Sequence, residues 1–262
     1  MPTILLINDD GINSIGLSLL AKQLKKIGDV VVVTPGGERS GVGKAICIGK
    51  VNVAETRFGD EIKAYATTGT PADSFLLAVN KIMKCIPDLV ISGINIGPNL
   101  GIDDVLTSGT IGAAFEAAIH HVPAIAVSYS LSEITEKMVD KRKVSIKDLE
   151  VAATLGYKTA KHVLENGMPI DVDIISINVP EKADCKNIKI TRLCYEGYGD
   201  IHTKIKEGYT IKSWALRHYP DGEPGTDLHA IKTDKCISIT PIKVEFLHNT
   251  QAMKDLKKTL SA

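Results

Sequence analysis

Two kinds of hydrophobic pattern alternate along the first two thirds of the chain. Short unbroken aliphatic runs are typical of strands that are buried on both faces of a sheet. Between these runs, apolar residues recur at helical spacing: Leu17, Leu20 and Leu24 lie on one stripe, and Ile111 and Ala114 lie on a later one. We therefore expect helices between buried strands, with the strands at residues 3–8, 29–35, 88–95, 123–130 and 173–180.

The order of these elements predicts an α/β fold. Strand, helix and strand in succession imply right-handed crossovers, so we expect a mainly parallel sheet with helices on both faces. Residues 45–69 break this rhythm and predict paired strands around a turn at residues 58–61. From about residue 185 the sequence becomes rich in β-forming residues and predicts an antiparallel extension. We expect two parts, a core at residues 1–184 and a β-rich extension at residues 185–262.

Composition and charge exclude several classes of partner. The chain has 262 residues, of which 44% are hydrophobic, so it can bury a stable core without disulfide bonds or structural metals. Its 31 Lys and Arg residues balance 31 Asp and Glu residues, so no overall charge attracts nucleic acid or an anionic membrane. The five cysteines show no zinc-site spacing, and no apolar run reaches transmembrane length. We therefore expect a cytoplasmic protein that binds neither nucleic acid nor membranes.

Asp9 and Asp10 follow the first predicted strand directly. Ligands of an open parallel sheet bind at the carboxyl ends of its strands, beside the point where strand order reverses. Adjacent carboxylates repel each other, and oxygen ligands of this kind suit a hard cation such as Mg²⁺ or Mn²⁺. The alternative is that Asn8 and the two aspartates cap a helix that begins near Asn13. The dipeptide alone favours neither interpretation.

Three further polar loops follow predicted strands or open a predicted helix. They are residues 36–45, residues 93–101 and the start of the helix at Ser108, Gly109 and Thr110. A helix start offers unpaired N–H groups, so the last of these loops could hold a phosphate. Taken alone, a simple Ser/Thr cap without a ligand is the more common explanation. All of these loops are predicted at one rim, which favours a metal site that faces an anion site.

One glycine-rich segment resembles a nucleotide-binding motif but fails on inspection. In "GVGKA", residues 41–45, a P-loop would need glycine where Glu38 stands and Ser or Thr where Ala45 stands. A dinucleotide-binding GxGxxG motif would need glycine where Ile46 stands. The segment therefore predicts neither kind of site.

Five motifs together resemble the SurE family of survival-protein nucleotidases. The resemblance spans roughly residues 3–130, and five motifs in the same order are far more specific than any one of them. The motifs are "NDDG" at 8–11, "ERSGVGKAI" at 38–46, "TTGTPADSF" at 67–75, "SGINIGPNLG" at 92–101 and "SGTIGAAFEAA" at 108–118.

The resemblance implies a Rossmann-like core with divalent-metal-dependent phosphatase activity on nucleoside 5′- and 3′-monophosphates. By motif position, one Mg²⁺ or Mn²⁺ ion per subunit would be held by Asp9, Asp10, Ser40 and Asn95. Whether a metal-bound water or an aspartate attacks phosphorus stays open. A broad acid phosphatase, an exopolyphosphatase and a nucleotide-binding module without activity are the alternatives.

The same resemblance assigns the phosphate site and the assembly. Asn99, Ser108, Gly109 and Thr110 match the positions that line the phosphate, and Asp9, Asp10, Asn95 and Ser108 are the expected catalytic residues. Family members often carry Arg where Ile96 stands, which bears on substrate affinity more than on chemistry.

A homodimer or homotetramer is expected, formed through the C-terminal extension. The tail helix places Met253, Leu256 and Leu260 on one face, which an adjoining subunit would cover. Nothing in residues 133–150 and 192–209 resembles a known motif.

Overall fold

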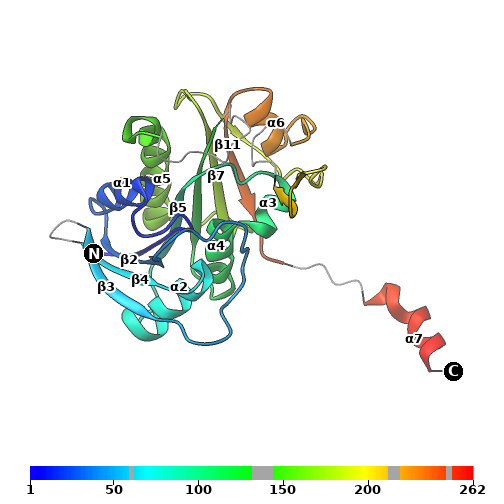
Figure 1. Ribbon diagram of the computed structural model, residues 1–262, viewed down its shortest axis with the longest axis horizontal. Helices are drawn as coiled ribbons and strands as arrows, with labels where there is room; N and C mark the ends of the chain where they lie inside the picture. The colour runs from blue at the N-terminus through cyan, green and yellow to red at the C-terminus, as the bar shows by residue number, and fades with distance from the viewer. Residues whose placement is uncertain (59–61, 132–143, 212–218, 246–249, 262) are drawn as a thin grey trace.

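A nine-stranded sheet forms the centre of the molecule (Figure 1). The computed structural model describes residues 1–58, 62–131, 144–211, 219–245 and 250–261, and the strand count refers to these residues. The strand order is β3-β4-β2-β1-β5-β6-β7-β11-β8. The strands are β1 (Thr3–Ile7), β2 (Asp29–Pro35), β3 (Val53–Phe58), β4 (Ile62–Thr67), β5 (Leu89–Ile96), β6 (Ala124–Ser130), β7 (Ile174–Pro180), β8 (Ile188–Ile190) and β11 (Ile237–Ile242).

Most neighbours in this sheet run parallel, which confirms the predicted α/β class. β1 pairs in parallel with β2 and β5, and the parallel series continues through β6 to β7. The predicted strand pair is present as antiparallel β3 and β4, whereas most of its predicted turn, residues 59–61, lies outside the described residues. All five predicted aliphatic strands are confirmed.

Helices cover both faces of the sheet (Figure 1). On one face, α1 (Ile15–Leu24) and α5 (Ile146–Asn166) pack side by side, and Leu17, Leu20 and Leu149 are fully buried there. On the other face, α2 (Pro71–Leu77) and α4 (Gly109–Ile119) pack together over Phe75 and Ile111. Because both layers exclude water, the middle strands are apolar on both faces. The shorter α3 (Gly101–Thr107) leads into α4, and the π-helix η1 (Ala78–Ile82) extends α2.

The strand order reverses between β1 and β5. From β1 the chain moves outward to β2, whereas from β5 it moves the other way to β6 and β7. Neighbouring loops at such a reversal diverge and leave a crevice at the carboxyl ends of the strands. The loop that follows β1 carries the predicted aspartates, and Asn95 lies at the end of β5.

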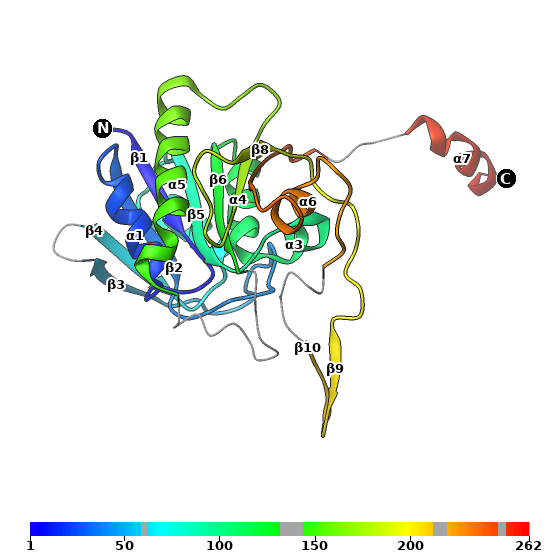
Figure 2. The same ribbon diagram turned by 90° about the horizontal axis from the view of Figure 1, so that it is seen from above.

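Beyond residue 184 the chain adds two strands to the sheet, β8 and β11, and forms a hairpin and a helix between them. β11 pairs antiparallel with β7, and β8 pairs parallel with β11, so the sheet continues across residue 184. The predicted boundary at that residue stays a prediction. The antiparallel hairpin of β9 (His202–Ile205) and β10 (Gly208–Ile211) projects from the body in Figure 2, and α6 (Asp227–Lys232) packs on β11.

The chain ends in a short predicted helix that the structure confirms. A single 3₁₀ turn, η4 (Gln251–Met253), leads into α7 (Lys254–Leu260), which stands apart from the body in both views (Figures 1 and 2). Residues 133–143 of the unassigned segment 133–150 lie outside the described residues, whereas the unassigned segment 192–209 is described in full. In the described part of the chain, no helix combines the length and the apolar character needed to cross a membrane.

Candidate active site

Asp9 connects the end of β1 to the first turn of α4. The residue is 4% exposed, and the Thr110 hydroxyl donates to Oδ1 at 2.6 Å while the Thr110 N–H donates to Oδ2 at 3.1 Å. The unpaired N–H groups and the dipole at a helix start favour a negative charge there. A Cβ atom on Gly109 would lie 2.9 Å from the Cβ of Asp9, so this close approach requires glycine. The strand end and the helix start are therefore in direct contact.

Asp10 turns toward the neighbouring strand instead. Its Oδ2 accepts a hydrogen bond from the backbone N–H of Ile96 at 3.0 Å, at the end of β5. The next residue toward the N-terminus, Asn95, donates through Nδ2 to the carbonyl of Gly97 at 3.0 Å. Because this bond uses the amide nitrogen, the amide oxygen of Asn95 is the atom suited to bind a cation. The two adjacent carboxylates are thus anchored on different elements, Asp9 on the start of α4 and Asp10 on the end of β5.

The helix-capping alternative for the aspartates is wrong. Helix α1 begins at Ile15 with Ser14 as its N-cap and has no side-chain capping hydrogen bond there, while Asp9 and Asp10 bond to Thr110 and Ile96. Asn8 shapes the turn instead: its amide exchanges hydrogen bonds with the backbone of Gly11 and accepts one from the Thr34 hydroxyl at 2.5 Å.

Ser40 lies on the exposed loop that follows β2. Within the described residues, its hydroxyl donates to Glu38 Oε1 at 2.6 Å, and no bond joins it to either aspartate. The neighbouring Arg39 provides the link, because its backbone N–H donates to the carbonyl of Asp9 at 2.7 Å. The loop is therefore fastened to the backbone of the residue that carries the first carboxylate.

The predicted phosphate residues take two different positions. Ser108 is the N-cap of α4, where its Oγ accepts from the N–H of Ile111 at 3.2 Å, so the capping geometry is confirmed. The Ser108 hydroxyl and the Gly109 N–H lie at the helix start, and the first N–H groups of a helix have no partner within the helix. Thr110 is fully buried, and both of its donors face Asp9.

Asn99 is held by a residue that the sequence pattern did not reveal. Its backbone N–H donates to Oδ1 of Asn178, and Nδ2 of Asn178 donates to its carbonyl, both at 2.9 Å. The side chain of Asn99 donates to Oγ of Ser128 at 2.8 Å. An amide inside the aliphatic run of β7 was the only available signal for Asn178.

The donor atoms at this rim suit a hard divalent cation. Asp9, Asp10 and Asn95 offer carboxylate and amide oxygens, which are the ligands that Mg²⁺ and Mn²⁺ prefer. In the described residues, His, Cys, Asp and Glu side chains form no group of three that could hold a metal, so neutral oxygens must complete such a site. The residues present therefore fit a cation with oxygen ligands.

Comparison with known proteins decides the family. A family model described as "Survival protein SurE" matches residues 4–200. The chain belongs to the SurE family. It is 39% identical to the 5′-nucleotidase SurE of Methanosarcina mazei, over 94% of this chain and 93% of that protein. The corresponding protein of Archaeoglobus fulgidus is 36% identical over 92% of this chain and 91% of its own length.

A solved SurE structure confirms the fold. The crystal structure of the SurE protein from Aquifex aeolicus matches 99% of this chain and 100% of its own chain, with a TM-score of 0.74 and 32% identity. The segments on both sides of residue 184 are therefore shared with a protein of known structure.

A buried polar cluster joins the SurE core to its extension next to the Ser108 cap. Asp104 of α3 accepts hydrogen bonds from the hydroxyls of Tyr198, at 2.5 Å, and Tyr219, at 2.9 Å, and from the N–H of Leu100 at 2.8 Å. Burial raises the pKa of Asp104 to about 7, although these donors act in the opposite direction. The same burial raises the pKa of both tyrosines. No sequence motif marked this cluster.

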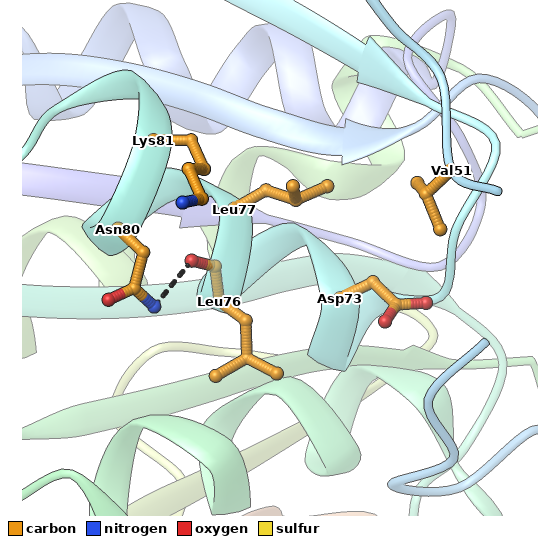
Figure 3. A pocket seen from close by; sticks show the side chains of 6 residues that line it. All are labelled: Val51, Asp73, Leu76, Leu77, Asn80 and Lys81. Carbon is orange, nitrogen blue, oxygen red and sulfur yellow. Dashed lines mark hydrogen bonds between the residues drawn. The ribbon is translucent and has the colours of Figure 1, made fainter. Parts of the chain in front are cut away.

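A hollow of about 380 Å³ lies beside α2 and η1 (Figure 3). Its one carboxylate, on Asp73, already accepts from the N–H groups of Thr70 and Cys47. None of its lining residues belongs to the predicted site, so we do not assign the reaction to it. The lining residues are Val51, Asp73, Leu76, Leu77, Asn80 and Lys81.

Proposed function

We propose that this SurE-family chain is a divalent-metal-dependent phosphatase that hydrolyses nucleoside 5′- and 3′-monophosphates to nucleoside and phosphate. One observation carries the proposal: the Asp9 carboxylate is anchored to the N-terminal turn of α4 beside Ser108 and Gly109. A cation ligand and a phosphate-binding helix start are thereby adjacent. The similarity to proteins named 5′-nucleotidase SurE supports the substrate class.

Asp9, Asp10, Ser40 and Asn95 would hold Mg²⁺ or Mn²⁺. When bound, such a cation neutralises phosphoryl oxygens and lowers the pKa of a coordinated water. The chain supplies the orientation of the ligands: Thr110 fixes the carboxylate of Asp9, and the N–H of Ile96 fixes that of Asp10. The side chain of Ile96 is aliphatic and buried in the core, so this position supplies no positive charge to the phosphate site.

Ser108 and Gly109 would bind the transferring phosphoryl group. A hydroxyl and a backbone N–H at a helix start donate hydrogen bonds to negative oxygens, and preorganised donors of this kind stabilise the charge that develops in the transition state. Asn99 completes the phosphate site in our proposal, and Asn178 holds its backbone in place.

A substrate panel tests the proposed activity. Purified protein is assayed with nucleoside 5′- and 3′-monophosphates, an aryl phosphate and polyphosphate, each with Mg²⁺, with Mn²⁺ and after chelation. We expect nucleoside monophosphates to be preferred and activity to vanish on chelation. Equal rates on the aryl phosphate would indicate a broad acid phosphatase, and preference for polyphosphate an exopolyphosphatase. Full turnover after exhaustive chelation would refute the metal dependence.

Asp9→Asn provides the matched test of the site itself. The substitution keeps the size of the side chain but removes a ligand charge, so we expect activity to fall by at least about 100-fold. Asp171→Asn is the control, because Asp171 is an exposed carboxylate that pairs with Lys243 at 2.7 Å in another part of the molecule. A chain that binds nucleotide but turns over none of the panel would be a binding module.

The assembly and location are also proposals. We propose a homodimer or homotetramer held by residues 185–262, supported by the exposed apolar face that Met253, Leu256 and Leu260 form on α7. A cytoplasmic location agrees with five cysteines that are all free thiols.

A further inference from the structure

The glycine-rich segment at residues 41–45, here called the strap, lies against the start of α4. The N–H of Gly43 donates to the carbonyl of Thr107 at 2.7 Å. A Cβ atom on Gly112 of α4 would lie 2.3 Å from the carbonyl oxygen of Gly43, so the two backbones touch where both residues are glycine. The segment that resembled a P-loop therefore packs on a helix of its own chain.

Lys44 fastens the strap to this helix through an ion pair. Its Nζ lies 2.5 Å from Oε2 of Glu116, whose side chain is only 6% exposed. Within the described residues Oε2 makes no hydrogen bond, so its contact with Lys44 is an ion pair, while Oε1 lies 3.3 Å from Nε2 of His120. A buried carboxylate is costly without a positive partner. Glu116 thus fixes the position of the Lys44 ammonium group and with it the strap.

The strap continues directly into the predicted metal loop. Ser40 precedes its first residue, Gly41, and the N–H of Arg39 donates to the carbonyl of Asp9 at 2.7 Å. Ser40 is therefore held between two anchors, one on Asp9 and one on α4. The two anchors are connected to each other, because the first turn of α4 also binds the Asp9 carboxylate.

We propose that Lys44 is a positioning residue of the metal site: its ion pair with Glu116 keeps Ser40 within reach of a cation bound by Asp9 and Asp10. The proposal rests on the metal-dependent function proposed above. Lys44 itself does not touch the cation or the substrate. If the ion pair served stability alone, its loss would lower the stability of the chain and leave metal binding unchanged.

Three variants separate these two roles: Lys44→Met, the double variant Lys44→Met with Glu116→Gln, and Lys189→Met. The first leaves Glu116 without its partner, whereas the double variant removes both charges and leaves no unpaired carboxylate. Lys189→Met is the control, since Lys189 makes a comparable ion pair at 2.7 Å with Asp234 in the extension. Affinity for Mn²⁺ alone is measured by isothermal titration calorimetry without substrate, and the melting temperature is measured on the metal-free proteins.

We expect Lys44→Met to bind Mn²⁺ about tenfold more weakly, the lower end of the range for groups that orient metal ligands. The double variant should recover the wild-type melting temperature yet keep the weakened Mn²⁺ binding. Lys189→Met should bind Mn²⁺ as wild type does. Recovery of wild-type Mn²⁺ affinity in the double variant would overturn the proposal. Absence of Mn²⁺ binding by the wild-type chain would overturn the metal site, and the role of Lys44 with it.

Discussion

Replacing Thr110 by Val tests whether this residue serves the metal or the phosphate. Valine has nearly the same shape as threonine, and position 110 is fully buried, so the substitution removes the hydroxyl and little else. The lost group donates to Oδ1 of Asp9 at 2.6 Å, while the backbone N–H still donates to Oδ2. The carboxylate keeps one of these two donors and loses the shorter bond.

The size of the effect follows from the charge of the acceptor. A hydrogen bond to a charged group contributes about 1.5–3 kcal/mol, which corresponds to about 10- to 100-fold in a binding constant. Loss of a group that orients a metal ligand typically has the same effect on metal affinity. We therefore expect Thr110→Val to weaken Mn²⁺ binding by about 10- to 100-fold and to lower the melting temperature by about 3–12 °C.

Calorimetric titration with Mn²⁺ and steady-state kinetics at saturating metal distinguish the two roles. Thr110→Ser is the matched control, because it keeps the hydroxyl and should bind Mn²⁺ within about threefold of wild type. If Thr110 contacts the phosphate directly, Thr110→Val will raise KM for the nucleotide and leave Mn²⁺ affinity unchanged. That result would refute our assignment of Thr110 to the orientation of Asp9.

Three further predictions concern other parts of the structure. Asn178→Ala removes both hydrogen bonds that hold the Asn99 backbone, so KM for nucleoside monophosphates should rise by about tenfold while Mn²⁺ affinity stays constant; an unchanged KM would contradict the positioning role. Burial raises the pKa of Asp104 from an ordinary 3.8 to about 7. Between these two values the folded chain holds a proton that the unfolded chain releases. Wild type should therefore lose stability relative to Asp104→Asn as the pH rises from about 4 to about 7. Melting temperatures of both proteins between about pH 4 and about pH 8 check this, and a constant difference would contradict it. Deletion of residues 250–262 should shift the protein toward monomer in light scattering and leave Mn²⁺ binding intact; a truncated chain that stays fully oligomeric would exclude the tail from the interface.

The sheet was predictable because its signal is local. Strands buried on both faces are continuous aliphatic runs, and right-handed crossovers then determine their direction. The same reasoning placed Asp9 and Asp10 at the carboxyl rim. The parallel pairing of β8 with β11 was not predictable, since β8 has only three residues and its sides are exposed.

The contacts within the site were beyond the reach of pattern analysis. Periodicity identifies which residues reach a rim, but it does not show which side chains bond to each other. Thr110 matched a phosphate position by motif, and only the structure showed that its two donors bond to Asp9. Asn178 and Asp104 belong to no motif, because their partners are distant backbone groups and tyrosines.

The two anchors of the aspartate pair make the site a late product of folding. Asp10 bonds to a residue 86 positions away, and Asp9 bonds to one 101 positions away. Contacts of such long range form slowly, because the intervening chain must first be ordered. A nascent or partly folded chain therefore has both carboxylates but lacks the assembled form of the proposed cation site, which requires β5 to pair with β1 and the first turn of α4 to reach Asp9.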